Sequence, residues 1–556
     1  MTLSSSPGIR PRPRDAAEPA PGRLPPRQSV RGNWVPRAAR LAAALAGLVA
    51  VGAYVFVALR RLDYPFALEP LEGNSLVEVH RILTGQPLYP APGAGYVPDG
   101  YPPLYFFVSA AVARVLGVSY LSLRLVSLGS SLACFAVLAR LVQRETGSIA
   151  AGTGAAGAFA ATYFATGTWF DIGRVDSLFL ALSIGGLYAA RHMRGTRGAV
   201  AAGALLAAAA LTKQTALAEV VAVTAAAFTV PRRAAPHQAG GARRGLAWVV
   251  ALTEVTVLGA AAVVLRLSSG GWFTYYILKQ MSEHSLTYSN FGWFWTALAT
   301  ATGLAACAAL IGARRVPREL LAGCAALAVE GYATLVHSGG SINDVLPAYL
   351  AVALLAGLAL GGGPGRRGTA WWVTPRLIAA VPGVLVLAQS VFLLAGAHPS
   401  QAIPASAARA AGERLVAGMR AFGGDVAVPD DPSLTLQAGM APAAVPGAAY
   451  DVLRATDRTG IASFRRSAQQ AVKTGQFSAF ITDSPGQPLD DPADLTRDYQ
   501  ECLQPQSAAS PGTLLVPVPG GSARPAVVWI PRGSGSCQHA IAVLDGTQTG
   551  SKAAGS

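Results

Sequence analysis

Two short stretches after the first long apolar segment decide how this chain is interpreted: Glu69-Pro70-Leu71-Glu72-Gly73-Asn74 and Asp99-Gly100-Tyr101-Pro102-Pro103-Leu104-Tyr105. They place carboxylates and aromatic rings together in a chain that is otherwise poor in charge. The Pro-Pro pair stiffens the backbone, so we expect the rings of Tyr101 and Tyr105 to be held in fixed directions. Together the two stretches predict the rim of a membrane-embedded site, and later segments would supply its other half.

The composition points to a membrane protein with many spans. The chain has 556 residues, of which 52% are hydrophobic and only 13% are charged, and its mean hydropathy is +0.39. The net charge of +15 lies mostly in short loops and in the N-terminal arm. This pattern indicates membrane topology and contact with lipid headgroups. No soluble segment interleaves a basic face with aromatic residues, so we expect no nucleic-acid partner.

Eleven segments are apolar enough to cross a bilayer, which takes about twenty mostly apolar residues or fewer where neighbours shield the ends. They are about 41–59, 121–141, 149–168, 176–190, 199–212, 215–230, 247–267, 292–312, 319–337, 345–362 and 374–396. A twelfth run, 104–118, is ambiguous. Five arginine clusters and the basic N-terminus all lie on the same side of the membrane only if the run 104–118 does not cross the bilayer. We therefore expect it to be a juxtamembrane helix on the outer face.

This topology places the N-terminus in the cytoplasm and the C-terminus outside the plasma membrane. Four polar loops then share the outer face, at about 60–120, 169–175, 268–291 and 338–344. The short turn at Lys213 and the tail after His398 join them. The positions Leu76, Val79 and Leu83 predict a surface helix in the first loop.

The expected fold class is mainly α: a membrane helix bundle with juxtamembrane helices and a small extracytoplasmic α+β domain. The predicted parts are a disordered basic tail, a transmembrane domain and the α+β domain, at 1–37, 38–398 and 399–556. Cys502 and Cys537 lie in the last part. They can pair if it faces an oxidising space, and two free thiols fit the sequence equally well.

Acidic residues beside apolar helix ends are candidates for a site because charge at membrane depth is costly. Glu69 and Glu72 open the first loop, although a solvated loop charge would also explain Glu72. Asp171, Arg174 and Asp176 lie at the junction of two predicted spans on the same face. Asp176 can equally serve as a cap for the helix that begins there.

Lys213 is a cation on the side that the positive-inside rule disfavours. An anionic partner, such as a phosphate at the membrane surface, would explain it, and so would a lysine that merely snorkels. The polar turn His337-Ser338-Gly339-Gly340-Ser341-Ile342-Asn343-Asp344 offers hydrogen bonds to hydroxyl groups through His337, Asn343 and Asp344. A tight structural turn explains its glycines equally well.

In order and spacing, these motifs resemble the GT-C superfamily of integral-membrane glycosyltransferases. Within it they are similar to the RgtA/B/C/D-like relatives of the dolichyl-phosphate-mannose and aminoarabinose transferases. Glu72-Gly73-Asn74, the helix through Leu83 and Tyr101-Pro102-Pro103-Leu104-Tyr105 match the first external loop of that family. Asp176 looks like its second acidic residue, and Lys213 like the basic residue of its Leu-Thr-Lys segment.

The resemblance implies transfer of a sugar from a polyprenyl-phosphate donor to a glycan, lipid or protein acceptor on the outer face. Glu72 would be the general base, and transfer would invert the anomeric carbon. Lys213 and Arg174 would stabilise the leaving phosphate. Asp176 would position a substrate or help to hold a divalent cation, if one is used.

The family often has Asp-Glu where this chain has Leu71-Glu72, so Glu69 can share or replace the role given to Glu72. The further predicted substrate contacts are Asp171, Tyr101, Tyr105, His337, Asn343 and Asp344.

Two other classes of function stay open. A transporter would show internal repeats or broken helices near mid-membrane, and the sequence shows neither. A non-catalytic protein of envelope assembly or anchoring would tolerate Glu72→Gln and Asp176→Asn. The residues do not identify the sugar or the acceptor, and the high usage of Ala, Gly, Arg and Pro points to a GC-rich bacterium.

Overall fold

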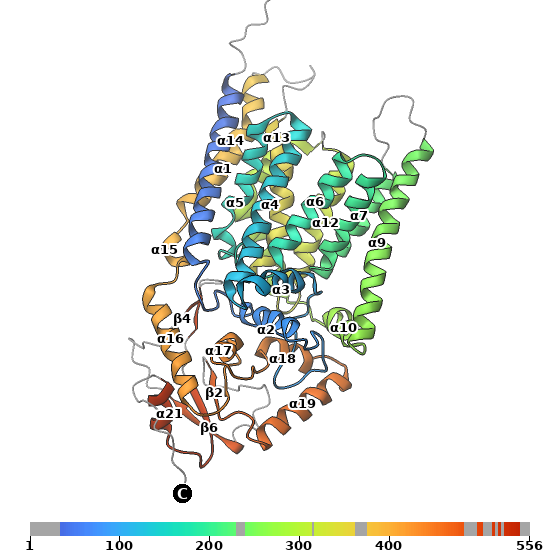
Figure 1. Cartoon of the computed structure of the whole chain (residues 1–556). Coiled ribbons are helices and arrows are strands. Elements are labelled where there is room, and N and C mark those ends of the chain that lie inside the picture. The colour runs from blue at the N-terminus through green and yellow to red at the C-terminus, as the bar shows by residue number, and fades with distance from the viewer. Residues whose placement is uncertain are drawn as a thin grey trace, which may run out of the picture.

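The computed structural model describes residues 34–229, 240–313, 316–361, 375–482, 497–503, 514–516, 521–523 and 527–544. A bundle of long helices fills one end of the molecule, and a mixed region of helices and short strands fills the other (Figure 1). The mainly α membrane bundle expected from the sequence is confirmed. The predicted disordered tail before Trp34 lies outside the described residues, and the domain boundaries stay predictions.

Each apolar segment predicted as a span coincides with a helix. The helices are α1 (Trp34–Arg61), α4 (Tyr120–Thr146), α5 (Ile149–Ala161), α6 (Asp176–His192), α7 (Gly195–Ala210), α8 (Leu217–Thr229), α9 (Gly240–Ser268), α11 (Tyr288–Gly312), α12 (Arg318–Leu335), α13 (Leu346–Gly361) and α14 (Pro375–Ala395). Within the described ranges, six helices are long and apolar enough to cross a membrane by length and composition: α1, α4, α9, α11, α13 and α14. The total of eleven crossings stays a prediction.

Helix α5 ends seven residues before the predicted limit of 168. The backbone behind it turns through a short 3₁₀ segment, Phe164–Thr166, and then through Gly167 and Thr168, whose φ angles are 66° and 64°. A left-handed conformation at two successive residues cannot continue an α-helix. The sequence from 162 to 168 is apolar enough for a span but is used to build a turn.

Small residues bring the helices of the bundle into close contact. The tightest approach joins α1 to α5, where a Cβ atom added to Gly157 would lie 2.0 Å from Cα of Gly47. Contacts between small residues are a common way for membrane helices to pack. This packing explains the many glycines and alanines in segments that must still be helical.

Ion pairs distinguish the two ends of the bundle. At one end Arg191 of α6 donates to Glu145 of α4 and to Glu319 of α12. At the other end Lys213 contacts Asp176 and Asp344 at 3.0 Å each. Arg191 belongs to one of the arginine clusters that were predicted to be cytoplasmic. The turns that were predicted to be external lie at the other end of the bundle, with Lys213.

Two further helices, α2 (Glu72–Leu83) and α3 (Leu104–Leu116), lie between the bundle and the mixed region (Figure 1). The amide of Leu104 donates to the carbonyl of Leu211 at 3.0 Å, which ties α3 to the Lys213 turn. The juxtamembrane position of 104–118 stays a prediction.

The C-terminal region carries a four-stranded sheet in the order β1-β2-β6-β3. Its strands are β1 (Val426–Ala427), β2 (Ala479–Thr482), β3 (Tyr499–Leu503) and β6 (Val527–Pro531), and only β1 and β2 pair in parallel. A separate pair joins β4 (Leu514–Val516) to β5 (Gly521–Ala523). The helices are α15 (Pro399–Ala402), α16 (Ser406–Ala421), α17 (Pro432–Gln437), α18 (Pro446–Leu453), α19 (Arg458–Lys473) and α21 (Cys537–Leu544).

Two contacts bear on how this region is held. A disulfide joins Cys502 to Cys537, so the structure selects the paired alternative. Helix α17 packs against α2, and a Cβ atom added to Gly73 would lie 2.8 Å from Oδ1 of Asp431. The loop between α9 and α11 contains α10 (Trp272–Thr274) and a π-helix, Tyr275–Gln280. It also contacts the C-terminal region, through Lys279 and Asp457 at 2.7 Å.

Candidate active site

Glu72 and Arg124 form a fully buried ion pair at the start of α2. Nε and Nη2 of Arg124 donate to the two carboxylate oxygens at 2.8 Å each. The amides of Leu68 and Gly173 donate to the same oxygens at 2.7 and 2.6 Å. Burial alone would raise the pKa of Glu72, but Arg124 and the two amides hold it below its ordinary value. All four acceptor positions are occupied, so the geometry does not suit the base role predicted for Glu72.

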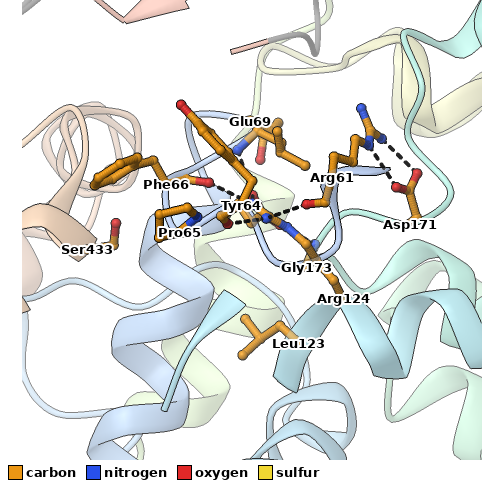
Figure 2. A network of polar contacts seen from close by, with 12 residues as sticks. Arg61, Tyr64, Pro65, Phe66, Glu69, Leu123, Arg124, Asp171, Gly173 and Ser433 are labelled. Carbon is orange, nitrogen blue, oxygen red and sulfur yellow. Dashed lines mark hydrogen bonds and ion pairs between the residues drawn. The ribbon is translucent and has the colours of Figure 1, made fainter. Parts of the chain in front are cut away.

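Asp171 and Arg61 form a second pair of this kind (Figure 2). Nε and Nη2 of Arg61 donate to the two carboxylate oxygens at 2.7 Å each, and Tyr163 Oη donates to Asp171 at 2.9 Å. Arg61 also donates to Oγ1 of Thr168, which has a positive φ, at 2.9 Å. Asp171 therefore helps to hold the turn between α5 and α6, and this position does not favour the substrate contact predicted for it.

Arg124 also organises the start of the first loop. Figure 2 shows its guanidinium among the backbone carbonyls of the chain that leaves α1. It donates to the carbonyls of Arg61, Tyr64 and Phe66 at 3.2, 2.5 and 2.7 Å. These bonds fix the segment that leads to Glu69.

Arg174 is the centre of a third buried cluster. Its Nη1 donates to Asp99 at 3.1 Å, its Nη2 lies 3.4 Å from Tyr101 Oη, and its Nε faces Oε2 of Glu69 at 3.6 Å. Asp99 also accepts from Asn74 at 2.7 Å. Arg174 therefore joins three groups of the first loop to the turn before α6.

Glu69 differs from Glu72 in how its carboxylate is satisfied. Its side chain is 6% exposed, and within the described part of the chain neither its Oε2 nor Nε of Arg174 has a hydrogen-bond partner. Burial raises the pKa of Glu69 to about 7, and the nearby Arg174 offsets this rise only in part. A carboxyl group with this pKa can both accept and release a proton near neutral pH.

Lys213 is the centre of a fourth cluster, formed by loops far apart in the sequence. Its Nζ donates to Oδ1 of Asp176 and to Oδ1 of Asp344 at 3.0 Å each. Asp176 also accepts from Asn343 Nδ2 at 3.2 Å and from Trp169 Nε1 at 2.9 Å. Burial opposes the charge of Lys213, but the two aspartates raise its pKa well above the ordinary value, so it stays a cation.

Tyr101 lies between the Arg174 and Lys213 clusters. Its ring lies against Arg174, with the guanidinium carbon 5.4 Å from the ring centroid. Burial raises the pKa of the Tyr101 hydroxyl to about 12, and the positive charges of Arg174 and Lys213 oppose this rise. Gln214, next to Lys213, donates to the carbonyl of Gly100 at 2.8 Å. The two clusters therefore form one site on one end of the bundle. It brings together Glu69, Tyr101, Arg174, Asp176, Lys213, Asn343 and Asp344, which the sequence predicted as site residues.

Two other predicted residues lie elsewhere. Tyr105 is fully buried, and its hydroxyl is bonded to the Leu123 carbonyl and to Ser127, both at 3.1 Å. The ring of His337 lies 6.4 Å from that of His284, near the contact with the C-terminal region. These positions suit a packing role for Tyr105 and a loop contact for His337.

Sequence reasoning did not single out Arg124, Asp99 or Trp169 as site residues. Arg124 had a usable signal, because a charge within an apolar segment marks a functional or structural site by default. Asp99 lies in the stretch from Asp99 to Tyr105, of which only the two tyrosines were predicted to contact a substrate. Nothing in the local sequence marks Trp169 as a partner of Asp176.

The donor set bears on the possible divalent cation. Within the described ranges, no group of three or more His, Cys, Asp or Glu side chains is placed to hold a metal ion. Asp176 and Asp344 both face Lys213, which already neutralises part of their charge.

Comparison with known proteins places the fold. Residues 100–258 match the family described as dolichyl-phosphate-mannose-protein mannosyltransferase. ArnT from Cupriavidus metallidurans bound to undecaprenyl phosphate has a similar structure, with a TM-score of 0.56, 13% identity and coverage of 88% of this chain and 98% of that chain. ArnT from the same organism in the apo state is also similar, with a TM-score of 0.56, 14% identity and coverage of 87% of this chain and 97% of that chain. No curated protein matches the sequence.

The fold is therefore that of the GT-C glycosyltransferases, and the resemblance predicted from the motifs is confirmed. More narrowly, the chain has an ArnT-like fold over nearly the full length of ArnT. The matched family and these neighbours are glycosyltransferases, which supports the prediction of an enzyme of this class. The apolar helices and these likenesses also indicate a membrane protein.

Proposed function

We propose that this protein transfers a sugar from a polyprenyl-phosphate donor to a hydroxyl acceptor at the outer face of the plasma membrane. Glu69 is the general base, and Arg174 and Lys213 bind the donor phosphate. The ArnT structure contains undecaprenyl phosphate, which is a lipid of this class. Polyprenyl phosphate is the leaving group of such a reaction and is a stable anion.

The observation that carries the proposal is the unfilled hydrogen-bonding capacity between Glu69 and Arg174. Oε2 of Glu69 and Nε of Arg174 are both buried and lie 3.6 Å apart, with no hydrogen bond to either atom in the described residues. Leaving two buried charged groups partly unsatisfied is costly, so such a pair marks a place where a ligand completes the bonding. The Glu72–Arg124 pair, which is fully satisfied, has no such capacity.

The chemistry follows from these positions. The oxygen of the acceptor hydroxyl attacks the anomeric carbon of the donor sugar, and Glu69 takes the proton of that hydroxyl. The bond from that carbon to the phosphate oxygen breaks, and the phosphate leaves with the electron pair. Arg174 and Lys213 stabilise the charge that develops on it. Attack opposite to the leaving phosphate inverts the anomeric carbon.

Lys213 can still bind a phosphate although it contacts two aspartates. An ammonium group has three hydrogens to donate, and Asp176 and Asp344 accept two of them. The aspartates hold the cation in place and keep it charged in a buried position. Asn343 and Trp169 in turn fix Asp176, so this cluster positions the phosphate-binding cation.

The proposal is tested with purified full-length protein in lipid nanodiscs, a panel of polyprenyl-phosphate sugars as donors, and glycan, lipid and peptide hydroxyl compounds as acceptors. The measurement is release of polyprenyl phosphate together with formation of a glycosylated product. We expect release with at least one donor, and loss of release in Glu69→Gln. Glu413→Gln, on the exposed face of α16, is the matched control and should behave as wild type. No release from any donor by well-folded protein would contradict the proposal.

A further inference from the structure

A crevice of about 440 Å³ separates the first external loop from the C-terminal region. Its polar lining comes from His80, Arg81 and Gln86 on one side and from Gln476 on the other, with Tyr96 and Met440 among its walls. Neither region forms it alone. This crevice is distinct from the site around Glu69 and Lys213, because none of the residues of that site lines it.

Hydrogen bonds between the two regions lie beside the crevice and fix the loop segment that forms part of its wall. Ser467 Oγ accepts from the amide of Ala94 at 3.0 Å, and Ser463 Oγ donates to the carbonyl of Pro92 at 3.1 Å. The amide of Ala444 donates to the carbonyl of Ala94 at 2.7 Å. Three direct bonds on one loop segment give a preformed wall, which is the usual state of a ligand site.

The chemistry of the lining selects an anionic, hydroxyl-rich ligand. Nε and Nη2 of Arg81 bind the carbonyl of Pro87 at 3.1 and 2.9 Å, and the guanidinium carbon lies 4.1 Å from the centre of the Tyr96 ring. The arginine is thus fixed in place, and among the described residues its Nη1 hydrogens have no hydrogen-bond partner, so they can bind a ligand. Among the described residues that line the crevice, none carries a carboxylate. The amides of Gln86 and Gln476 and the ring of His80 can bond hydroxyl groups.

The crevice is connected to the proposed active site through α2. Glu78 of that helix accepts from the amide of Asp99 at 2.9 Å, and Asp99 binds Arg174. Arg81 follows Glu78 by about one turn, which is roughly 5 Å along the axis. A ligand in the crevice would therefore lie close to the cluster that holds Glu69, on the side of the predicted external loops.

We propose that this crevice binds an acidic sugar, one bearing a carboxylate or a phosphate group, in the acceptor of the transfer reaction. The inference rests on the proposed function, because only a transferase has an acceptor. It adds a class of acceptor and a binding site for it. Arg81 binds the anionic group, and Gln86 and Gln476 bind hydroxyls.

The test measures binding of three small probes to full-length protein in nanodiscs by saturation-transfer NMR and titration. The probes are methyl glucuronide, methyl glucoside 6-phosphate and neutral methyl glucoside. We expect one or both acidic probes to bind at least about tenfold more tightly than the neutral one, because a bond to a charged group is worth about 1.5–3 kcal/mol. The stronger acidic probe identifies the anion. The inference would be overturned if all three probes bound equally tightly or if no probe bound.

Variants separate this inference from the proposed function. Arg81→Gln and Gln476→Ala should each weaken binding of the acidic probe about tenfold or more, whereas Arg409→Gln, near Asp63, should not. Release of polyprenyl phosphate should be unchanged in Arg409→Gln, which lies outside both proposed sites. If the wild type releases polyprenyl phosphate normally but Arg81→Gln and Gln476→Ala both bind the acidic probe as the wild type does, the crevice is not the acceptor site. The proposed function would then still stand. Absence of release in the wild type would overturn the proposed function and, with it, the acceptor assignment.

Discussion

The two carboxylates of the first loop, Glu69 and Glu72, are three residues apart and have opposite surroundings. Glu72 is matched to Arg124 by two hydrogen bonds of 2.8 Å, and two backbone amides complete its shell. Glu69 faces Arg174 at 3.6 Å, with a carboxylate oxygen that is buried and unbonded among the described residues. One pair is closed, and the other is open to a third partner.

This difference separates structural from functional charge in a membrane protein. A buried ion pair is tolerated when geometry and additional bonds satisfy both groups, and breaking it by removing one partner is strongly destabilising. A pair with unused bonding capacity gains when a substrate completes it. Burial alone therefore does not identify the catalytic carboxylate, because Glu69 and Glu72 are both buried. The count of bonds to each oxygen distinguishes these two residues.

The substitution Glu69→Gln tests the difference between the two carboxylates most directly. If Glu69 takes the acceptor proton, we expect the turnover number to fall about 10²- to 10⁴-fold, the usual contribution of a general base. The thermal midpoint should fall less than in Glu72→Gln, because the amide is isosteric and Arg174 keeps its ion pair with Asp99. Turnover within threefold of wild type would assign the base elsewhere.

Glu72→Gln is the matching change in the closed pair. It leaves Arg124 buried without a counter-charge, so we expect a loss of roughly 3–5 kcal/mol of stability. The measurement is the thermal midpoint and the yield of monodisperse protein after extraction from the membrane. An unchanged midpoint would show that the closed pair is not structural.

Lys213→Met extends the comparison to the phosphate-binding side. Removing a cation that stabilises a leaving group should lower turnover about 10²- to 10³-fold. Lys279→Met is the matched control, because Lys279 forms its ion pair with Asp457 at the surface, with half of its side chain exposed. Equal effects of the two changes on donor turnover would remove Lys213 from the site.

The pH dependence gives the smallest expected effect. Burial raises the pKa of Glu69 to about 7, so in acid the group is protonated and cannot accept the acceptor proton. Turnover should fall about tenfold per pH unit below pH 7 and level off above it. A rate that is flat between pH 5 and 7, with the protein still folded, would argue against Glu69 as the base.

The helices were predictable because each predicted span is marked by its own run of apolar residues. The surface helix of the first loop was predictable from the helical spacing of Leu76, Val79 and Leu83. The early end of α5 was not predictable, since Thr168 takes a left-handed conformation that tertiary bonds from Arg61 support. Helix α17 gave no long periodic signal and escaped prediction.

The members of the site were partly predictable, and their pairing was not. Charges beside helix ends pointed to Glu69, Asp176 and Lys213 on general grounds. Which carboxylate is neutralised depends on Arg124, a residue from α4 that contacts Glu72 only after folding. The local sequence around Glu69 and Glu72 contains no information about that partner, so the local pattern alone could not rank the two carboxylates.

The most direct measurement is the rate of polyprenyl-phosphate release by Glu69→Gln and Glu72→Gln with one donor, each normalised to the amount of folded protein. We predict that Glu69→Gln loses at least 99% of the wild-type rate, about the hundredfold lower bound for a base, while the folded fraction of Glu72→Gln keeps most of it. The reverse result, a fast Glu69→Gln and a folded but inactive Glu72→Gln, would contradict the assignment of the open pair as the catalytic one.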